Sequence, residues 1–403
     1  MRNTVVALGV VIAAGLLVGG CSGGPHAPSP PPVNPAQGPY VGAEVCRPCH
    51  SNVHAGWSGT KHHEALSVLT AIGQVTNANC LPCHTVGYGQ PTGYRGADTP
   101  QLANVQCENC HGAGGNHASN PSANAMTVSR ASEVCGQCHT GIHHPNFEQW
   151  ETSKHAAALT TLQSRPYATD ECLQCHSVDA YLGNRDQVVL RTASVVAENP
   201  ITCVLCHRPH RKAQEAQLRL PVEDICIQCH TAGDVLPSGS PHHPQKEMLA
   251  GQGAFAADGS PLDVSGPHTT GVAERCVQCH VHKSAPAEPT VENPVNTGHT
   301  FLPDVPTACQ ECHPGDQASE FKAEVQGETE AALQQLRPYF ASGSPSFIDP
   351  STLAPADRAR YDVAKFNYNF VTADKSEGVH NVEYTEQLLG VSLDIVQSLA
   401  GGP

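Results

Sequence analysis

Nine short motifs of one pattern, Cys-x-x-Cys-His, constrain this chain more than any other feature of its sequence. They use 18 of the 19 cysteines, and only Cys21 lies outside them. Each motif holds two thiols and an imidazole within five residues, so its chemistry limits what the chain can fold around. The motifs begin at Cys46, Cys80, Cys107, Cys135, Cys172, Cys203, Cys226, Cys276 and Cys309.

This motif is the attachment site of c-type haem, in which two thiols bond to the porphyrin and the adjacent histidine binds the iron. Zinc ribbons use Cys-x-x-Cys knuckles in pairs, a redox centre needs one, and structural disulfides leave the histidine unexplained. The sequence therefore predicts nine covalently bound haem c groups. The attachment residues are Cys46, Cys49, Cys80, Cys83, Cys107, Cys110, Cys135, Cys138, Cys172, Cys175, Cys203, Cys206, Cys226, Cys229, Cys276, Cys279, Cys309 and Cys312. The motif histidines, predicted as iron ligands, are His50, His84, His111, His139, His176, His207, His230, His280 and His313.

The composition supports this interpretation. Aromatic residues make up 5% and hydrophobic residues 39% of the 403 residues, whereas glycine and proline number 36 and 33. That is little bulky apolar material for a core, and many turn formers for long regular elements. We expect a mainly α chain with much irregular loop, in which stacked haems form the core and stabilise the fold.

The N-terminus predicts export. Residues 1–20 combine a charged start with an apolar run, which is typical of a signal peptide and too short for a membrane span. Cys21 follows two glycines, as the lipid-bearing cysteine of a bacterial lipoprotein does. The alternative is an ordinary signal peptide that leaves Cys21 as a stray thiol. Residues 21–40 are a Pro-rich linker. From the signal peptide and Cys21 we expect a lipid-anchored protein in the periplasm, outer membrane or cell surface.

The nine motifs group into three trios, which we interpret as repeats of one unit. A tryptophan is followed five residues on by a histidine in the first trio, at Trp57 and His62, and in the second, at Trp150 and His155. The second and third trios share a His-His-Pro sequence. The predicted segments are 41–130, 131–220 and 221–316 for the trios and 317–403 for a C-terminal helical cap.

The C-terminal segment differs in pattern from the rest of the chain. Apolar residues recur at helical spacing from Phe321 to Leu336, from Tyr361 to Val371 and from Leu389 to Ala400. Three helices are therefore predicted, with a loop at residues 342–352 between the first two. No sustained strand alternation occurs along the chain.

The sequence resembles the multihaem cytochrome c superfamily, which includes the tetrahaem carrier of ammonia oxidisers, the nitrite and hydroxylamine enzymes and exported metal-respiration cytochromes. The resemblance rests on the CxxCH…W…SKH blocks, on GHTF before the last motif and on DKSEGVHNVEYTEQLL, and it spans residues 41–389. It implies a multihaem cytochrome c fold with a C-terminal helical segment. It also implies axial ligands at His62, His155, His299 and His380, the last on the third helix of the cap.

The remaining axial ligands are predicted from position. Fourteen histidines outside the motifs and the linker can fill nine positions, and methionine, with three copies, cannot compete. His117 and His210 closely follow a motif, and His268 precedes the eighth. One of each His-His pair is expected, and we choose the first. The positional choices are therefore His117, His143, His210, His242 and His268, while His54, His63 and His282 are left as ordinary surface histidines.

The leading functional hypothesis is an electron carrier in anaerobic or extracellular respiration. Two histidines on each iron leave no position for a substrate, and the scarcity of methionine predicts low potentials. The expected partners are redox proteins, including other multihaem cytochromes, with membrane contact through lipid on Cys21. Self-assembly is a further option. Nucleic acid is disfavoured because the formal net charge is −15.

The alternative is a reductase or oxidoreductase for nitrite, hydroxylamine or a sulfur oxyanion, with one open iron position and nearby proton donors. The related nitrite reductases usually carry lysine in place of one motif histidine, whereas all nine motifs here end in histidine. We therefore expect a carrier rather than an enzyme. A haem-rich structural component of an electron-transfer complex is the third option.

Overall fold

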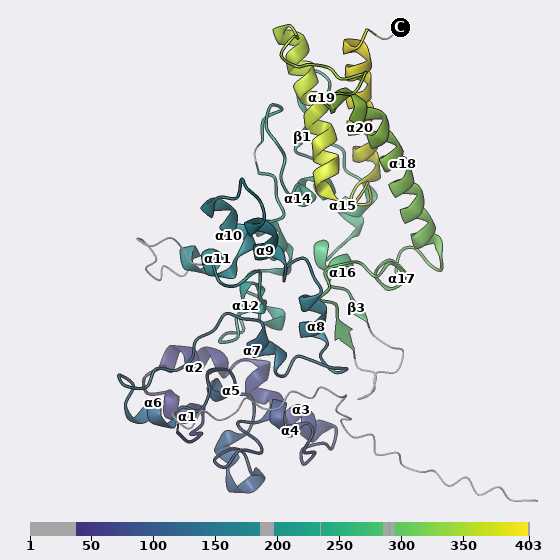
Figure 1. The fold of residues 1–403 in the computed structure, drawn as a ribbon. Coiled ribbons are helices and arrows are strands. Elements are labelled where there is room, and N and C mark those ends of the chain that lie inside the picture. Colours follow the sequence, from purple (N-terminus) through teal and green to yellow (C-terminus); the bar gives the residue numbers. More distant parts are fainter. Residues whose placement is uncertain (1–37, 186–196, 234, 285–289, 291–294, 402–403) are drawn as a thin grey trace, which may run out of the picture.

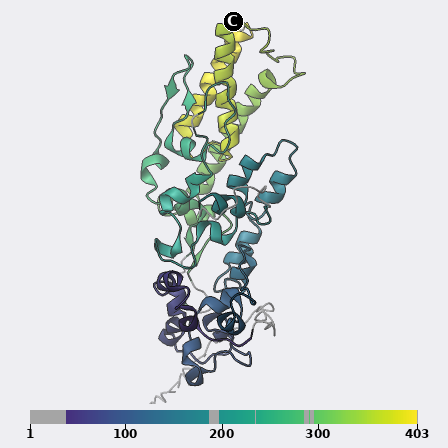
Figure 2. The same ribbon diagram turned by 90° about the vertical axis from the view of Figure 1, so that its left-hand side faces the viewer.

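The computed structural model describes residues 38–185, 197–233, 235–284, 290 and 295–401. The predicted signal peptide, Cys21 and most of the predicted linker lie outside these ranges. The described residues form an elongated molecule, with the first motifs at one end and the C-terminal helices at the other (Figure 1). A view turned by 90° shows the same order along the long axis (Figure 2). None of the helices in the described ranges is long and apolar enough to cross a membrane.

The motif-bearing part consists of short helices joined by irregular loops. Its α-helices are four to eight residues long, and the strands in its described part form two antiparallel pairs of two-residue strands. The prediction of a mainly α chain with much irregular loop is confirmed. The elements around the first three motifs are α1 (Ala43–Cys46), α2 (Ser51–Trp57), η2 (Lys61–Glu64), α3 (Ala65–Ala71), α4 (Leu81–His84), η3 (Gly96–Asp98), η4 (Pro100–Leu102), α5 (Cys107–His111) and α6 (Gly115–Ser119).

The next two groups of motifs continue in the same way. Around the second trio lie α7 (Glu133–Gly136), α8 (Asn146–Glu151), α9 (Ala158–Gln163), η5 (Asp170–Cys172), α10 (Leu173–His176), α11 (Val178–Arg185), α12 (Cys203–Cys206) and η6 (Glu215–Gln217). Around the third trio lie α13 (Val222–Ile225), η7 (Cys226–Gln228), α14 (Gln245–Ala250), β1 (Ala254–Phe255), β2 (Pro261–Leu262), α15 (Pro267–Gly271), α16 (Cys276–His280), β3 (Lys283–Ser284), β4 (Asn296–Thr297) and α17 (Val305–Ala308).

Several motifs form a single helical turn that stops at the histidine or just before it. In α5 the motif CENCH is the whole helix, and Gly112 ends it with a φ of 85°, a left-handed conformation that glycine adopts without strain. Helices this short are not stable alone in water. Their stability must come from long-range contacts, which include the packing around each attachment site.

The repeated tryptophans make the same long-range contact in two repeats. The indole Nε1–H of Trp57 donates to the carbonyl oxygen of Val105 (3.0 Å), and that of Trp150 donates to the carbonyl oxygen of Ile201 (2.8 Å). Val105 and Ile201 each lie two residues before the third motif of their trio. In both units the tryptophan therefore connects the segment after the first motif to the segment just before the third motif.

The C-terminal cap consists of α18 (Gln317–Phe340), α19 (Pro355–Asp374) and α20 (Val382–Leu399), which pack side by side at one end of the molecule (Figure 1). Its core is conventional and apolar. The largest fully buried side chains there belong to Tyr361, Phe366, Phe370, Tyr384, Leu336, Leu388 and Ile395. Met248 and Ala254 join the same cluster, so the cap packs onto the third trio.

Two details of the cap differ from the prediction. Phe321 is 49% exposed and contacts His313, whereas the buried residues of α18 are Ala318, Thr329, Leu333 and Leu336. His380 lies in the turn before α20 and not on the helix, since Asn381 is the N-cap residue, its side chain accepting from the N–H of Tyr384.

Candidate haem sites

Eight of the nine motif histidines lie opposite a histidine from outside the motifs. The two rings of each pair come from distant parts of the sequence, and their centres are about equally spaced in all eight pairs. The pairs are His50–His117 (6.3 Å), His62–His139 (6.1 Å), His111–His210 (5.9 Å), His155–His230 (6.2 Å), His176–His243 (6.1 Å), His207–His299 (6.2 Å), His268–His313 (6.3 Å) and His280–His380 (6.2 Å).

The remaining motif histidine is His84, in the second motif. Its electrostatic interaction with His144 indicates which histidine lies near it. Desolvation lowers the pKa of His144, and the charges of His84 and His143 lower it further. The ring of His144 also lies 5.5 Å from that of His139, so it is close to both the second and the fourth motif. His144 is therefore a candidate partner of His84.

The pair spacing fits a bound iron. An imidazole nitrogen binds a transition metal at about 2.0 Å, so two imidazoles on opposite faces of one metal place their ring centres roughly 6 Å apart. Direct stacking or edge contact of two rings does not require one constant spacing, and it allows shorter distances such as the 4.0 Å between His242 and His243. The donor set and the spacing thus both suit bis-histidine haem iron.

Hydrogen bonds at Nδ1 orient these rings so that Nε2 is left for a metal. A backbone carbonyl can only accept, so the imidazole nitrogen that faces it carries the proton. Such second-shell bonds fix the ring and its tautomer in metal sites generally. The bonds are His84 to Ala65 (2.7 Å), His111 to Thr127 (2.6 Å), His117 to Asn124 (2.7 Å), His207 to Ala216 (2.8 Å), His268 to Val379 (2.8 Å), His280 to Phe301 (2.9 Å) and His299 to Thr297 (2.9 Å).

The electrostatics favour the ligating form of histidine. Burial, followed by the charges of neighbouring histidines, lowers the pKa of His139, His155 and His243 to about 4. These imidazoles are therefore neutral at pH 7, and the neutral imidazole is the form that binds a metal.

His380 is the exception among the facing histidines. Burial lowers its pKa, but the hydrogen bond and the charge of Asp374 outweigh burial and raise it above the ordinary value. The Nδ1 atom of His380 lies 2.7 Å from Oδ1 of Asp374. We did not predict this carboxylate from the sequence, because an acidic residue in the turn before a helix has no distinguishing spacing.

Attachment cysteines of different motifs also lie close together. The thiols of Cys46 and Cys107, of Cys83 and Cys138, of Cys135 and Cys203, and of Cys226 and Cys276 lie close enough to shift one another's pKa. Haems attached at such neighbouring cysteines would lie close to one another, since a thioether bond is short. The described motifs are therefore packed side by side and not distributed as isolated sites.

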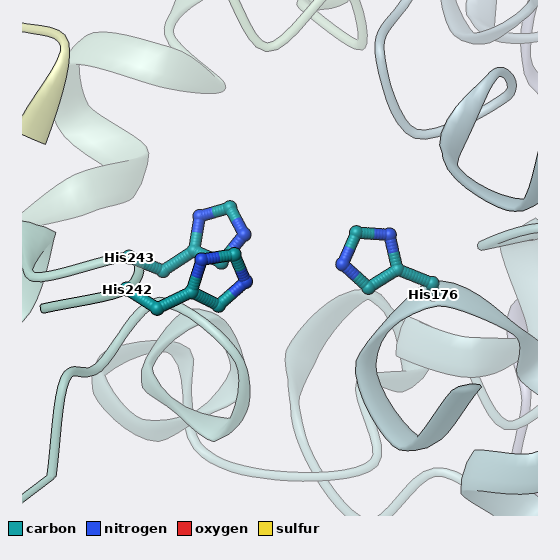
Figure 3. Close-up of side chains that lie close together, drawn as sticks. All are labelled: His176, His242 and His243. Carbon is teal, nitrogen blue, oxygen red and sulfur yellow. The ribbon is translucent and has the colours of Figure 1, made fainter. Parts of the chain in front are cut away.

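Two histidines face His176 in Figure 3. One nitrogen from each of His176, His242 and His243 lies within 4.8 Å of the other two. The ring of His243 has the spacing of the other pairs, at 6.1 Å from His176, and it also lies 5.7 Å from His230. His243 adopts a φ of 55°, a left-handed conformation that is strained for histidine.

Two of the histidines left without a role lie against Trp57. His54 contacts its ring at 5.3 Å and approaches Glu44 at 3.2 Å, and His63 contacts it at 4.7 Å. His282 lines a cavity of about 350 Å³ with Gln149 and Asp304. Within the described ranges, the ring contacts of His54, His63 and His282 pair none of them with a motif histidine.

The segments that carry the first two trios of motifs both match one known protein family. The family described as cytochrome c554 and c-prime matches residues 45–112 and 134–208, and a doubled CXXCH motif family matches residues 194–234. The multihaem cytochrome MtrA of Shewanella baltica (strain OS185) is 26% identical over 178 residues, which is 38% of this chain and 52% of MtrA. Cytochrome c-554 of Nitrosomonas europaea is 31% identical over 97 residues, which is 20% of this chain and 41% of that protein. The alignments thus span about half or less of the length of these relatives.

The fold as a whole also has a solved counterpart. The outer cell wall cytochrome OcwA superposes with a TM-score of 0.68 at 22% sequence identity, over 89% of this chain and 100% of OcwA. This similarity extends to the C-terminal cap, which the family matches do not reach. The matched segments and the CXXCH motifs together establish covalent haem c attachment.

Proposed function

We propose that this chain, which is similar to multihaem cytochromes c, is an electron carrier with nine covalently attached haems, each held by two histidines. The observation that carries the proposal is the constant spacing of 5.9–6.3 Å in eight facing histidine pairs. Haem iron, when bound, supplies a reversible one-electron couple. The two imidazoles of each pair would hold such an iron, and an iron held in this way would offer no open position to a substrate.

The ligand assignment follows the facing pairs. The proposed distal ligands agree with the predictions at seven positions and replace His143 by His144 and His242 by His243, on the contacts described above. In order of the nine motifs, the distal ligands are His117, His144, His210, His62, His243, His299, His155, His380 and His268.

The contacts between motifs support one continuous row of sites. The row passes through the first, third, fourth, sixth, seventh, eighth and ninth motifs, with the second beside the fourth and the fifth beside the seventh. The order of the row follows the thiols that interact electrostatically with one another, which are Cys46–Cys107, Cys110–Cys135, Cys135–Cys203, Cys206–Cys226, Cys226–Cys276 and Cys279–Cys309. Cys49 in the first motif and Cys312 in the ninth are exposed, as is Cys110 in the third. Both ends of the row are therefore open to solvent, and we propose them as the sites of electron entry and exit.

The predicted low potentials belong to this proposal. Bis-histidine ligation without methionine keeps potentials low. Export and a lipid on Cys21 are proposed from the N-terminal sequence, and the relative named for the outer cell wall supports a location outside the cytoplasm. Anaerobic or extracellular respiration is the process in which such a carrier would operate, with other redox proteins as its partners.

Two measurements on the matured protein test the proposal. Iron and haem determined per polypeptide should give nine, and reduction followed by carbon monoxide should leave the Soret band almost unchanged, because carbon monoxide needs an open iron position. A carbon monoxide shift in part of the band, together with turnover of nitrite or hydroxylamine, would replace the carrier by the reductase alternative. A count below nine would show that some motifs do not attach haem.

A further inference from the structure

A buried carboxylate is directed at one of the proposed ligands. Asp374 is the last residue of α19, its side chain is 1% exposed, and its Oδ1 lies 2.7 Å from Nδ1 of His380. The other carboxylate oxygen accepts from the hydroxyl and the backbone N–H of Ser376. The Ser376 hydroxyl in turn accepts from the N–H of His380 (3.2 Å). The turn from Asp374 to His380 is thus closed on itself by hydrogen bonds.

No cation neutralises this carboxylate in the described part of the chain. The ion-pair partner of Asp374 is His380 itself, and the neighbouring amide of Gln245 binds the backbone carbonyl of Asp374 and not its side chain. The negative charge is therefore presented to the imidazole. His380 faces His280 at 6.2 Å. Burial lowers the pKa of His280, and the charge of Asp374 opposes that shift.

The acceptor at His380 differs in kind from those at the other facing histidines. Seven of them, His176 included, donate Nδ1–H to neutral backbone carbonyls, as His84 does, and His230 faces the side-chain amide oxygen of Gln245 at 3.3 Å. Among the hydrogen bonds of these ligands within the described ranges, the acceptor at His380 is the one that carries a formal charge. A charged acceptor gives a shorter and stronger bond and makes the imidazole a more basic ligand.

We propose that Asp374 is a positioning residue that strengthens His380 as a donor to the iron at the eighth motif and lowers that haem's reduction potential. The inference rests on the proposed ligation by His380 and deepens it. The carboxylate holds the Nδ1 proton of His380, which gives the imidazole partial imidazolate character. Added electron density and a nearby negative charge both stabilise ferric over ferrous iron, so reduction becomes harder.

The test removes the negative charge of Asp374 and keeps the shape of its side chain. In the full-length matured protein, Asp374→Asn should raise the potential of one haem, so that its reduced-to-oxidised ratio at a fixed applied potential increases about tenfold, equal to about 59 mV for one electron. The low-spin electron paramagnetic resonance signal of the same haem should change its g values. Asp374→Glu should restore both readouts in part. Asp349→Asn, which removes an exposed carboxylate, controls for net charge and should change neither.

The outcomes separate this inference from the function on which it rests. Carbon monoxide binding at one haem in His380→Ala supports the ligation, and its absence would remove both the ligation and the role of Asp374. If His380→Ala opens a site but Asp374→Asn leaves all potentials and g values unchanged, the carrier stands and this inference is wrong. If Asp374→Asn fails to mature, Ser376→Ala, which loosens the carboxylate, should shift the same haem upward by less; no shift would overturn the proposal.

Discussion

His62, in the first repeat, faces His139, in the first motif of the second repeat, with 6.1 Å between their ring centres. His155 in the second repeat faces His230 in the third in the same way, at 6.2 Å. The first two units therefore each place a histidine opposite a motif histidine of the next unit. Under the proposed ligation these units would not be independent modules, because their metal sites would be shared between them.

This sharing predicts which haem each histidine serves. His155→Ala should create one haem that binds carbon monoxide, and that haem should be the one attached at Cys226 and Cys229. Replacing those two cysteines by alanine in the His155→Ala background should abolish carbon monoxide binding. His63→Ala, which removes a histidine that contacts Trp57 and no motif histidine, is the matched control and should bind none. Persistent binding in the triple variant would assign His155 to another motif.

The adjacent histidines in Figure 3 provide a second prediction. His243→Ala should open the haem of the fifth motif to carbon monoxide, whereas His242→Ala should leave the Soret band of the reduced protein unchanged. The reason is that the ring of His243 has the 6.1 Å spacing to His176 that the other pairs share. The reverse result would restore His242, the residue that we chose from the sequence.

The repeated tryptophan contact predicts equal losses of stability. Trp57→Phe and Trp150→Phe keep most of the apolar ring but leave the carbonyls of Val105 and Ile201 without their donors. Each variant should lose about 1–3 kcal/mol of unfolding free energy. Denaturant titration followed by circular dichroism measures this, with Ser58→Ala, an exposed neighbour, as the control. A loss in only one of the two would show that the repeats are not equivalent.

The cap contains a buried amide whose removal should be costly. Asn367 is fully buried, accepts from the N–H of Phe255 (3.2 Å) and donates to its carbonyl oxygen (2.8 Å). Asn367→Leu should destabilise the cap by about 1–3 kcal/mol or more, because both backbone groups of Phe255 lose their partner. Asn369→Ala, on the same helix and half-buried, should cost much less in the same thermal or denaturant unfolding experiment. Equal losses would contradict the role of the bond pair.

Glu108 predicts a pH dependence of stability. Its carboxylate accepts from the N–H groups of Val41 (3.0 Å), Gly42 (2.8 Å) and Gly114 (2.7 Å), yet burial raises its pKa more than these bonds lower it. A raised pKa in the folded state means that the stabilising contribution is complete below the unfolded pKa of about 4.3. It is lost as the pH rises through the folded pKa.

The comparison variant for this residue is Glu108→Gln. The difference in unfolding free energy, wild type minus variant, should decrease as the pH rises from about 4.3, since the variant has no titrating group there. Denaturant titrations at several pH values measure it. A difference that increases over that range would mean that the backbone bonds dominate and that the pKa is lowered.

The sequence by itself determined the chemistry of the attachment sites. The spacing of two thiols and an imidazole within a five-residue motif is a local property of the sequence. Cys46, Cys49 and His50 therefore identify a haem attachment site independently of the tertiary structure. The low content of bulky apolar residues correctly indicated a chain of short helices and loops. The apolar stripes after residue 317 likewise predicted three helices, because helical periodicity is local as well.

Tertiary structure decided which histidine faces which motif. The sequence reduced the choice to a set of candidates, but it did not connect His62 to the fourth motif or His210 to the third. It also did not reveal the carboxylate of Asp374 behind His380. Each of these relations joins residues through loops whose crossing depends on the packing of the whole molecule. Residue spacing along the chain shows which side chains a single turn brings together. Which distant histidine lies opposite a motif depends instead on the long-range folding of the chain.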